Sequence, residues 1–283
     1  MVSQNENLSV ETKVEVVKLP KKAVVVLSGG LDSTTLLHYV VKELECEVYP
    51  ISFHYGQRHN VELEMAKWQV SKLKEEGYNI HDLKIVDMGF MKELLRGSSA
   101  LVDDSIDVPD MKDVENDSQP ITYVPYRNLM MLSIALSYAE AVGAEVVFYG
   151  AQRQDEYGYW DTTMEFIKRV NEVSMLNREH KIRIVAPFVN LNKAEEIVIG
   201  KELSVDYSKT WSCYVGLSDE GKACGKCPSC VDRITNFAKV GIKDPMQYEN
   251  EIDWDKLIKK YKKEIKLEDV KNKILEALVK QLS

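Results

Sequence analysis

The feature that most limits how this chain can fold is a regular alternation of short apolar stretches with longer amphipathic ones. Each apolar stretch has the length of a buried strand, and each amphipathic stretch has the spacing of a helix with one apolar face. Such alternation predicts parallel strands joined by right-handed crossovers, and hence a Rossmann-like α/β fold, an open parallel sheet with helices on both faces. The expected strands are 22–27, 47–53, 83–88, 145–149 and 182–186, and the expected helices are 32–44, 61–73, 128–142 and 162–173.

The same pattern divides the chain into four parts. The first part is polar, aperiodic and ends at Pro20, which is typical of a flexible arm. The last part is a charged helical tail, and its apolar residues, Leu275 and Leu278 among them, are expected to pack on the body. The expected parts are the arm at 1–20, an α/β domain at 21–205, a small helical zinc-binding region at 206–250 and the tail at 251–283.

Three polar loops follow expected strands, at 28–33, 54–59 and 151–161. Ligands of open parallel sheets bind beyond the carboxyl ends of the strands, which all lie at one edge. We therefore expect the three loops to share one site. The longest stretch without periodicity, 96–122, is acidic, and its length is typical of a lid, a binding loop or an insertion.

The first of these loops has the features of a phosphate site. The segment VVVLSGGLDSTT at 24–35 places two glycines and several hydroxyls between a strand and a helix. Gly29 and Gly30 lack a Cβ and allow close approach to the backbone, while the helix start offers N–H donors and a favourable dipole. The segment lacks the lysine of a Walker sequence and the third glycine of a dinucleotide fingerprint. By itself it also fits a simple glycine turn capped by Asp32.

Four of the five cysteines fall within eighteen residues, in the pattern C-x10-C-x2-C-x2-C. In a reducing compartment such crowding indicates a metal site rather than disulfides. Four thiolates complete a tetrahedral zinc with no open position, which is a structural site, and an iron–sulfur cluster is the alternative. Cys46 stands alone, and we expect it to be a buried structural thiol. The expected zinc ligands are Cys213, Cys224, Cys227 and Cys230.

Charge and hydropathy narrow the possible partners. The net charge of −8 and the pI near 5.3 argue against a binder of duplex nucleic acid, which needs a dense basic surface. The first 22 residues contain no apolar core of a signal peptide, and the longest apolar runs are far too short to span a bilayer. We expect a cytoplasmic protein whose partners include neither a membrane nor nucleic acid.

The segment SGGLDS at 28–33 resembles the PP-loop of the ATP pyrophosphatases. The resemblance implies that ATP is split into AMP and pyrophosphate and that the substrate is adenylated on the way. It also implies that Asp32 acts at the nucleotide through Mg²⁺, which offsets phosphate charge. The ATP-binding residues implied are Leu27, Ser28, Gly29, Gly30, Leu31, Asp32, Ser33, Thr34 and Arg127.

Further motifs resemble one group within this superfamily, the 7-cyano-7-deazaguanine synthases of the queuosine and archaeosine pathways. The likeness covers roughly residues 22–250. It implies that 7-carboxy-7-deazaguanine and ammonia are converted to the nitrile by two adenylations through an amide, and that the protein is a homodimer. The motifs are YGQRH at 55–59, LNKAEEIV at 191–198, TWSCY at 210–214, CGKCPSC at 224–230 with Arg233 after it, and DPMQY at 244–248.

The motifs suggest roles for individual side chains. Arg58 and Lys193 are the cations expected at phosphates or at the substrate carboxylate, although either is also compatible with an ordinary surface charge. His59 is a candidate proton acceptor for the incoming amine, or a hydrogen-bonded structural histidine. Asp155 and Asp161 are candidates for the guanine-like edge, because a carboxylate accepts both of its N–H groups, or are solvated or capping acids. The other candidate substrate-binding residues are Tyr55, Gln57 and Asn128.

The chain departs from the family pattern in two places. Tyr126 replaces the usual glycine of Val-Pro-Gly-Arg-Asn, and 159–163 reads Tyr-Trp-Asp-Thr-Thr instead of Tyr-Pro-Asp-Cys-Arg. An enzyme with a pocket altered in this way could stop at the amide, or accept another amine, including one on a protein. A PP-loop enzyme acting on tRNA and a non-catalytic zinc-bearing module are further alternatives. The acidic charge argues against the first of these, and the intact SGGLDS loop argues against the second.

Overall fold

The computed structural model describes residues 18–56, 60–113, 120–153 and 159–283. Almost all of the expected arm at 1–20 therefore lies outside the described residues. So do four of the residues expected at the site: Gln57, Arg58, His59 and Asp155.

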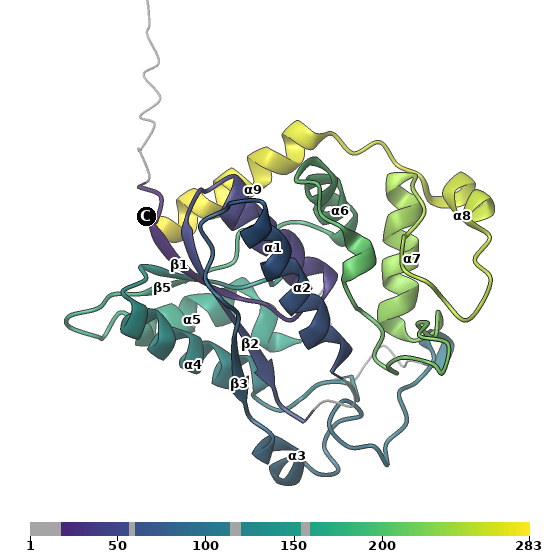
Figure 1. Cartoon of the computed structure of the whole chain (residues 1–283), viewed down its shortest axis with the longest axis horizontal. Coiled ribbons are helices and arrows are strands. Elements are labelled where there is room, and N and C mark those ends of the chain that lie inside the picture. The colour runs from purple at the N-terminus through teal and green to yellow at the C-terminus, as the bar shows by residue number, and fades with distance from the viewer. Residues whose placement is uncertain (1–17, 57–59, 114–119, 154–158) are drawn as a thin grey trace, which may run out of the picture.

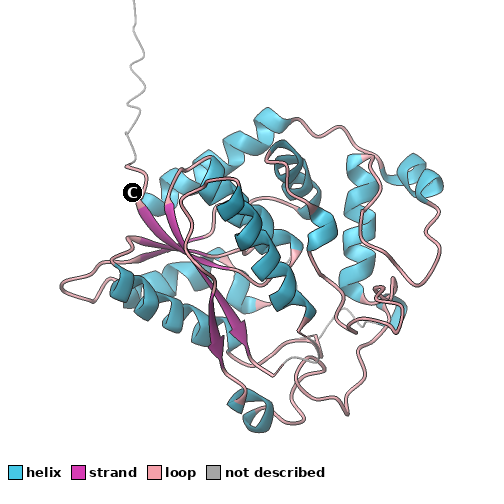
Figure 2. Ribbon diagram, viewed as in Figure 1, coloured by secondary structure: helices cyan, strands magenta, loops and turns pink. Residues whose placement is uncertain are grey.

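Five parallel strands form one sheet in the order β3-β2-β1-β4-β5, with β1 at its centre (Figure 2). All five strands expected from the sequence are confirmed, and no strand end differs from the expected one by more than one residue. Ala23, Val24 and Val25 of the central strand are fully buried, as expected for a parallel strand covered on both faces. The strands are β1 Lys22–Val26, β2 Glu47–His54, β3 Lys84–Asp87, β4 Val146–Phe148 and β5 Arg183–Val185.

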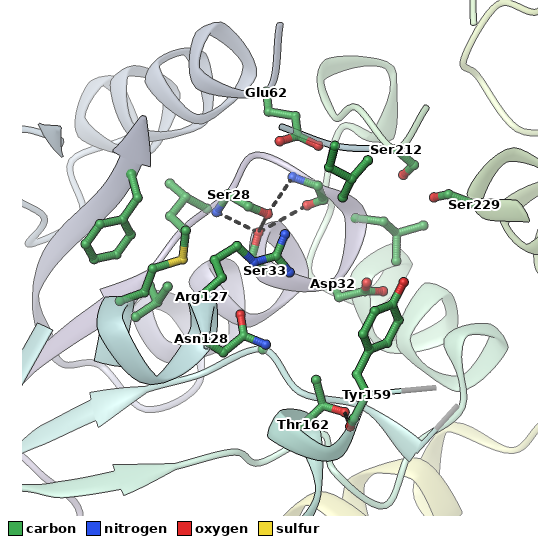
Figure 3. A pocket seen from close by; sticks show the side chains of 18 of the residues that line it. Ser28, Asp32, Ser33, Glu62, Arg127, Asn128, Tyr159, Thr162, Ser212 and Ser229 are labelled. Carbon is green, nitrogen blue, oxygen red and sulfur yellow. Dashed lines mark hydrogen bonds between the residues drawn. The ribbon is translucent and has the colours of Figure 1, made fainter. Parts of the chain in front are cut away.

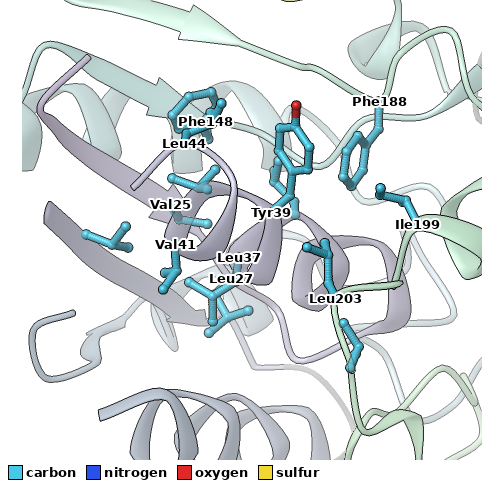
Figure 4. Packing of buried hydrophobic residues seen from close by; sticks show 14 of the residues in the cluster. Val25, Leu27, Leu37, Tyr39, Val41, Leu44, Phe148, Phe188, Ile199 and Leu203 are labelled. Atoms are coloured by element: carbon cyan, nitrogen blue, oxygen red, sulfur yellow. The ribbon is translucent and has the colours of Figure 1, made fainter. Parts of the chain in front are cut away.

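Helices cover both faces of the sheet, which confirms the predicted fold class (Figure 1). One apolar cluster joins Val25 and Phe148 of the sheet to α1, α2, α6 and α9 (Figure 4), and the other joins Val24 and Val147 to α4 and α5. The four helices expected between strands are present as α1 Leu31–Lys42, α2 Val61–Glu75, α4 Arg127–Val142 and α5 Met164–Ser174.

Two helices of the body were not expected from the sequence, the short α3 Phe90–Leu94 and the longer α6 Lys193–Glu202. The N-terminus of α6 is fixed by a capping box, in which Asn192 Oδ1 accepts the Glu195 N–H and Glu195 Oε2 accepts the Asn192 N–H. The described part of segment 96–122 contains a short 3-10 turn, Met111–Asp113, and the Met111 N–H donates to the carbonyl of Lys226. This loop therefore reaches the cysteine region.

The last part of the chain forms the helices α7 Pro228–Val240, α8 Trp254–Tyr261 and α9 Leu267–Leu282, so the single expected tail is two helices. Of these, α7 and α8 lie away from the sheet, whereas α9 packs back against it (Figure 1). Val270, Ile274 and Leu278 of α9 are buried at helical spacing, but Leu275 is 59% exposed. The expectation that Leu275 packs on the body was wrong, because it falls on the opposite face of this helix. No described helix combines the length and the apolarity that crossing a membrane requires.

Candidate functional site

The turn between β1 and α1 is tight, and its shape depends on glycine. Gly29 has a φ of +88°, a conformation that other residues rarely adopt. A Cβ on Gly29 would overlap the backbone oxygen of Glu62, at the start of α2. The Ser28 and Ser33 hydroxyls lie 2.9 Å apart, and the Gly30 N–H donates to Ser28 Oγ at 3.2 Å (Figure 3). The loop thus presents hydroxyls and backbone N–H groups at a helix start, which suits an anion.

A cavity of about 270 Å³ opens beside this loop, at the carboxyl edge of the sheet. The structure brings together here residues that the sequence assigned to separate motifs. Gly29, Thr34 and Asp161, also expected at the site, are buried and are not among the lining residues. The expected site residues that line the cavity are Leu27, Ser28, Gly30, Leu31, Asp32, Ser33, Tyr55, Arg127, Asn128, Lys193 and Cys213.

Arg127 is the first residue of α4 and projects across the cavity (Figure 3). Its Nη1 donates to the Tyr55 hydroxyl at 3.3 Å, and its guanidinium lies 5.4 Å from the centre of the Tyr55 ring. Asp161 lies nearby, where burial raises the pKa of its carboxyl and the charge of Arg127 partly opposes the rise. A half-buried guanidinium held in this way can pair with a phosphate or a carboxylate.

Glu62 is a cavity residue that the sequence analysis missed. It belongs to the first turn of α2 and faces the phosphate loop (Figure 3). Burial raises the pKa of the Glu62 carboxyl to about 7, although the charge of Arg127 opposes the rise. A carboxyl with that pKa exchanges its proton near neutral pH. In the sequence, Glu62 is indistinguishable from the acids that commonly stabilise a helix N-terminus.

Lys193, the first residue of α6, also lines the cavity. Its side chain is only 12% exposed. Its Nζ lies 2.7 Å from Asp232 Oδ2, on α7, and 3.8 Å from Asp32 Oδ2, on the phosphate loop. The structure therefore places a largely buried ammonium near two carboxylates. One belongs to the phosphate loop of the α/β body and the other to α7.

The four clustered cysteines are all buried, and their sulfur atoms lie within 4.8 Å of one another. The sulfurs of Cys224 and Cys230 are 3.9 Å apart. That spacing fits one ion, since a tetrahedral site with metal–sulfur bonds of about 2.3 Å has edges of about 3.8 Å. Two backbone N–H groups also point at the sulfurs: that of Cys224 at Cys213 and that of Cys227 at Cys224. The predicted cluster is confirmed as a group that could hold a metal. Cys46 is buried elsewhere, as expected, and its thiol donates to the carbonyl of Pro20.

We call residues 206–250 the cysteine module. It contacts the phosphate loop directly, because the Trp211 N–H donates to the carbonyl of Gly29 at 3.0 Å. The segment before the first cysteine is fixed from within by Arg233, which is fully buried. Arg233 donates to both carboxylate oxygens of Asp244, at 2.7 and 3.0 Å, and to the hydroxyls of Thr210 and Ser212. The module thus forms one wall of the cavity.

The two departures from the family pattern meet at the rim of the cavity. Tyr126 adopts a left-handed conformation with φ of 53°, and its ring contacts Trp160 edge to face at 5.5 Å between centroids. The Trp160 indole N–H donates to the Tyr123 hydroxyl. The hydroxyl of Thr162 donates to the Tyr159 carbonyl, and Thr163 caps α5 by accepting from the Phe166 N–H. Both replaced stretches therefore have local partners.

A family model described as queuosine biosynthesis protein QueC matches residues 22–241. The 7-cyano-7-deazaguanine synthase of Caldicellulosiruptor saccharolyticus is 46% identical over 234 residues, covering 83% of this chain and 98% of that protein. The synthase of Clostridium kluyveri is 46% identical over 237 residues, covering 82% and 99%. Among solved structures, the U34-tRNA thiolase NcsA of Methanococcus maripaludis overlaps with a TM-score of 0.44 at 15% identity, over 95% of this chain and 75% of that one. So loose an overlap supports no conclusion about this chain.

Proposed function

This chain belongs to the QueC family of queuosine biosynthesis proteins, and on that premise we propose that it is a 7-cyano-7-deazaguanine synthase. Its substrates are 7-carboxy-7-deazaguanine, ammonia and ATP. The reaction is an ATP-dependent formation of a carbon–nitrogen bond, in which the acid is adenylated, aminated to the amide, adenylated again and converted to the nitrile.

The observation that carries this proposal is the meeting of the phosphate loop with Arg127 and Lys193 around one cavity. A carboxylate is a poor electrophile until one of its oxygens becomes part of a good leaving group. Attack of the substrate carboxylate on the α-phosphate supplies that group as AMP and releases pyrophosphate. Loop N–H groups and hydroxyls bind the phosphate tail, while the cations stabilise charge that develops during the transfer.

Asp32 is the residue we propose to hold Mg²⁺. Its Oδ1 is buried and, within the part of the chain that the structure describes, accepts no hydrogen bond, so that it suits a hard cation. The ion, when bound, offsets phosphate charge and stabilises the leaving pyrophosphate. We propose that Lys193 contacts the same phosphate groups of ATP. The catalytic roles proposed for Arg58 and His59 fall outside the described residues.

Tyr55, Asn128 and Asp161 are proposed to bind the deazaguanine. Asn128 lies next to Arg127 at the start of α4 and lines the cavity beside Tyr159 and Thr162 (Figure 3). The proposed binding residues Gln57 and Asp155 lie in segments that the structure does not describe.

The cysteine cluster is proposed to hold a structural Zn²⁺, because four buried thiols leave no position open for a substrate. A homodimer and a cytoplasmic location complete the proposal and rest on the sequence and its resemblance to the family.

The test is incubation of the purified protein with 7-carboxy-7-deazaguanine, ATP, Mg²⁺ and ammonia, followed by measurement of AMP and of product mass. We expect two AMP for each nitrile formed. One AMP for each amide would instead show an enzyme that stops halfway, and no AMP with any ammonia concentration would overturn the proposal.

A matched pair of glycine variants tests the phosphate loop itself. Gly29 and Gly77 both have positive φ, but a Cβ on Gly77 would meet nothing within 4 Å, whereas one on Gly29 would overlap backbone. We expect Gly29→Ala to lower AMP formation by about 100-fold or more, because loss of one oriented set of donors has effects of this order. Gly77→Ala should retain the wild-type rate, and equal losses in both variants would contradict the assignment.

A further inference from the structure

The position of Lys193 is fixed at both ends of its side chain. At the backbone end, it lies within the capping box formed by Asn192 and Glu195, and Lys273 of α9 donates to Glu195 Oε1 at 2.5 Å. At the other end, its Nζ lies 2.7 Å from Asp232 Oδ2. A lysine on a free surface keeps many rotamers, whereas this one is held in a single direction.

Asp232 is itself held from behind. It lies on the second turn of α7, and its Oδ1 accepts a hydrogen bond from Asn236 Nδ2 at 2.7 Å. The same amide donates to the Asp232 carbonyl at 2.9 Å, and Lys239 Nζ donates to Asn236 Oδ1. Asn236 is fully buried. One carboxylate oxygen of Asp232 is therefore engaged by a buried amide, and the other faces Lys193.

The alternative partner for Lys193 is close. Asp32 Oδ2 lies 3.8 Å from the same Nζ, within the range where opposite charges attract strongly in a partly buried site. If Lys193 moved fully onto Asp32, the two groups assigned to the nucleotide would neutralise each other. Asp232 lies closer and competes for the ammonium, which keeps the Asp32 carboxylate available for a cation.

We propose that Asp232 is a positioning residue, which holds Lys193 beside the phosphate loop and keeps it from pairing more closely with Asp32. It does not touch the reacting atoms but acts through Lys193. This inference rests on the proposed function, and it adds that the cysteine module supplies a side chain on which nucleotide binding depends.

A double-mutant cycle tests the proposal. Asp232→Asn keeps the size of the side chain and an oxygen that can accept from Asn236, but removes the charge that holds Lys193. We expect it to weaken MgATP binding by about 10-fold in calorimetry, with a matching rise in the KM for ATP. In a Lys193→Met background, the same substitution should have no further effect, because it acts only through the lysine.

Glu249→Gln is the matched control, since it removes one carboxylate from an exposed position of the same module. Its MgATP affinity should equal that of the wild type. Metal content and melting temperature, measured on every variant, separate a positioning effect from loss of the fold. If the Asp232→Asn variant loses its metal, the Asp232→Glu variant takes its place in the cycle. The expected loss of MgATP affinity is then smaller, because the negative charge is retained but displaced.

Two outcomes would overturn the inference. One is an equal loss of MgATP affinity from Asp232→Asn with and without Lys193, and the other is no loss in the wild-type background. Because calorimetry needs no deazaguanine, these outcomes differ from failure of the proposed function, which would appear as normal MgATP binding without AMP formation by the wild type.

Discussion

Around the sheet most buried side chains are apolar, whereas the centre of the cysteine module contains four thiols and a buried ion pair. The sheet is covered by two large clusters that include residues such as Val25, Phe148 and Ile184. Beside the four cysteines, the buried apolar residues of their cluster are Trp211, Ala223 and Met246, while Tyr207 and Phe237 of the module belong to a cluster on the sheet. Apolar packing spreads stability over many contacts, while the module concentrates it in a few specific ones. The two regions should therefore unfold in response to different perturbations.

The largest expected difference follows removal of the metal. Structural zinc in small domains contributes on the order of 10 kcal/mol to folding, so chelation or Cys227→Ser should unfold the module. The sheet should remain folded because neither of its clusters includes the four clustered cysteines, although Tyr207 and Phe237 of the module pack into one of them. Hydrogen exchange would show this as fast exchange in α7 beside protected amides in β1. Simultaneous loss of protection in both regions would mean that they form a single cooperative unit.

The next largest effect is the loss of stability when a buried ion pair is broken, compared with the loss when an exposed pair is broken. Asp244→Asn leaves the fully buried guanidinium of Arg233 without its charged partner, which typically costs about 3–5 kcal/mol. Asp255→Asn breaks the exposed pair with Lys243 and should change stability by less than about 1 kcal/mol. Urea unfolding of the metal-saturated proteins measures both. Similar midpoints for the two variants would show that the module is less dependent on this pair than its geometry implies.

A third effect lies on the side of the sheet and depends on pH. His38 of α1 is buried, and burial lowers the pKa of its imidazole to about 4. The unfolded chain binds this proton below about pH 6.5 and the folded chain only below about pH 4. Stability should therefore fall by up to about 3 kcal/mol as the pH drops from 6.5 to 4, with no further loss from this group below that.

The pH dependence assigned to His38 has a matched control. His38→Gln should flatten the stability profile over this interval, whereas the exposed His180→Gln should leave its slope unchanged. The measurement is the urea midpoint at a series of pH values. A profile that keeps its slope in His38→Gln would assign the acid sensitivity to other groups.

The smallest effect concerns reactivity rather than stability. Burial raises the pKa of the Cys46 thiol to about 12, so this cysteine of the body has almost no thiolate at neutral pH. A thiol reagent should find no reactive cysteine in the metal-bound protein, four after chelation and the fifth only in denaturant. Cys46→Ala should remove that last thiol alone. Detection of five thiols after chelation would show that the body opens with the module.

The sequence was sufficient to predict features that recur along the chain or that depend on neighbouring residues alone. The strand-and-helix alternation predicted all five strands, and the SGGLDS and cysteine spacings predicted which residues gather. Helix α6 was missed because its polar residues include the buried Glu196 and its apolar residues are few. Glu62 and Asp232 were missed for another reason. Their importance depends on which helix faces the phosphate loop, and only packing between distant segments decides that.

The hydrogen bond from Trp211 to Gly29 has a consequence for how the protein is made. A ribosome releases the phosphate loop early, but the residue that closes it emerges much later, followed by the last cysteines. During synthesis, the phosphate loop therefore lacks its contact with the cysteine module until most of the chain has left the ribosome. We therefore expect that chains that end before Trp211 lack a finished site and do not cleave ATP.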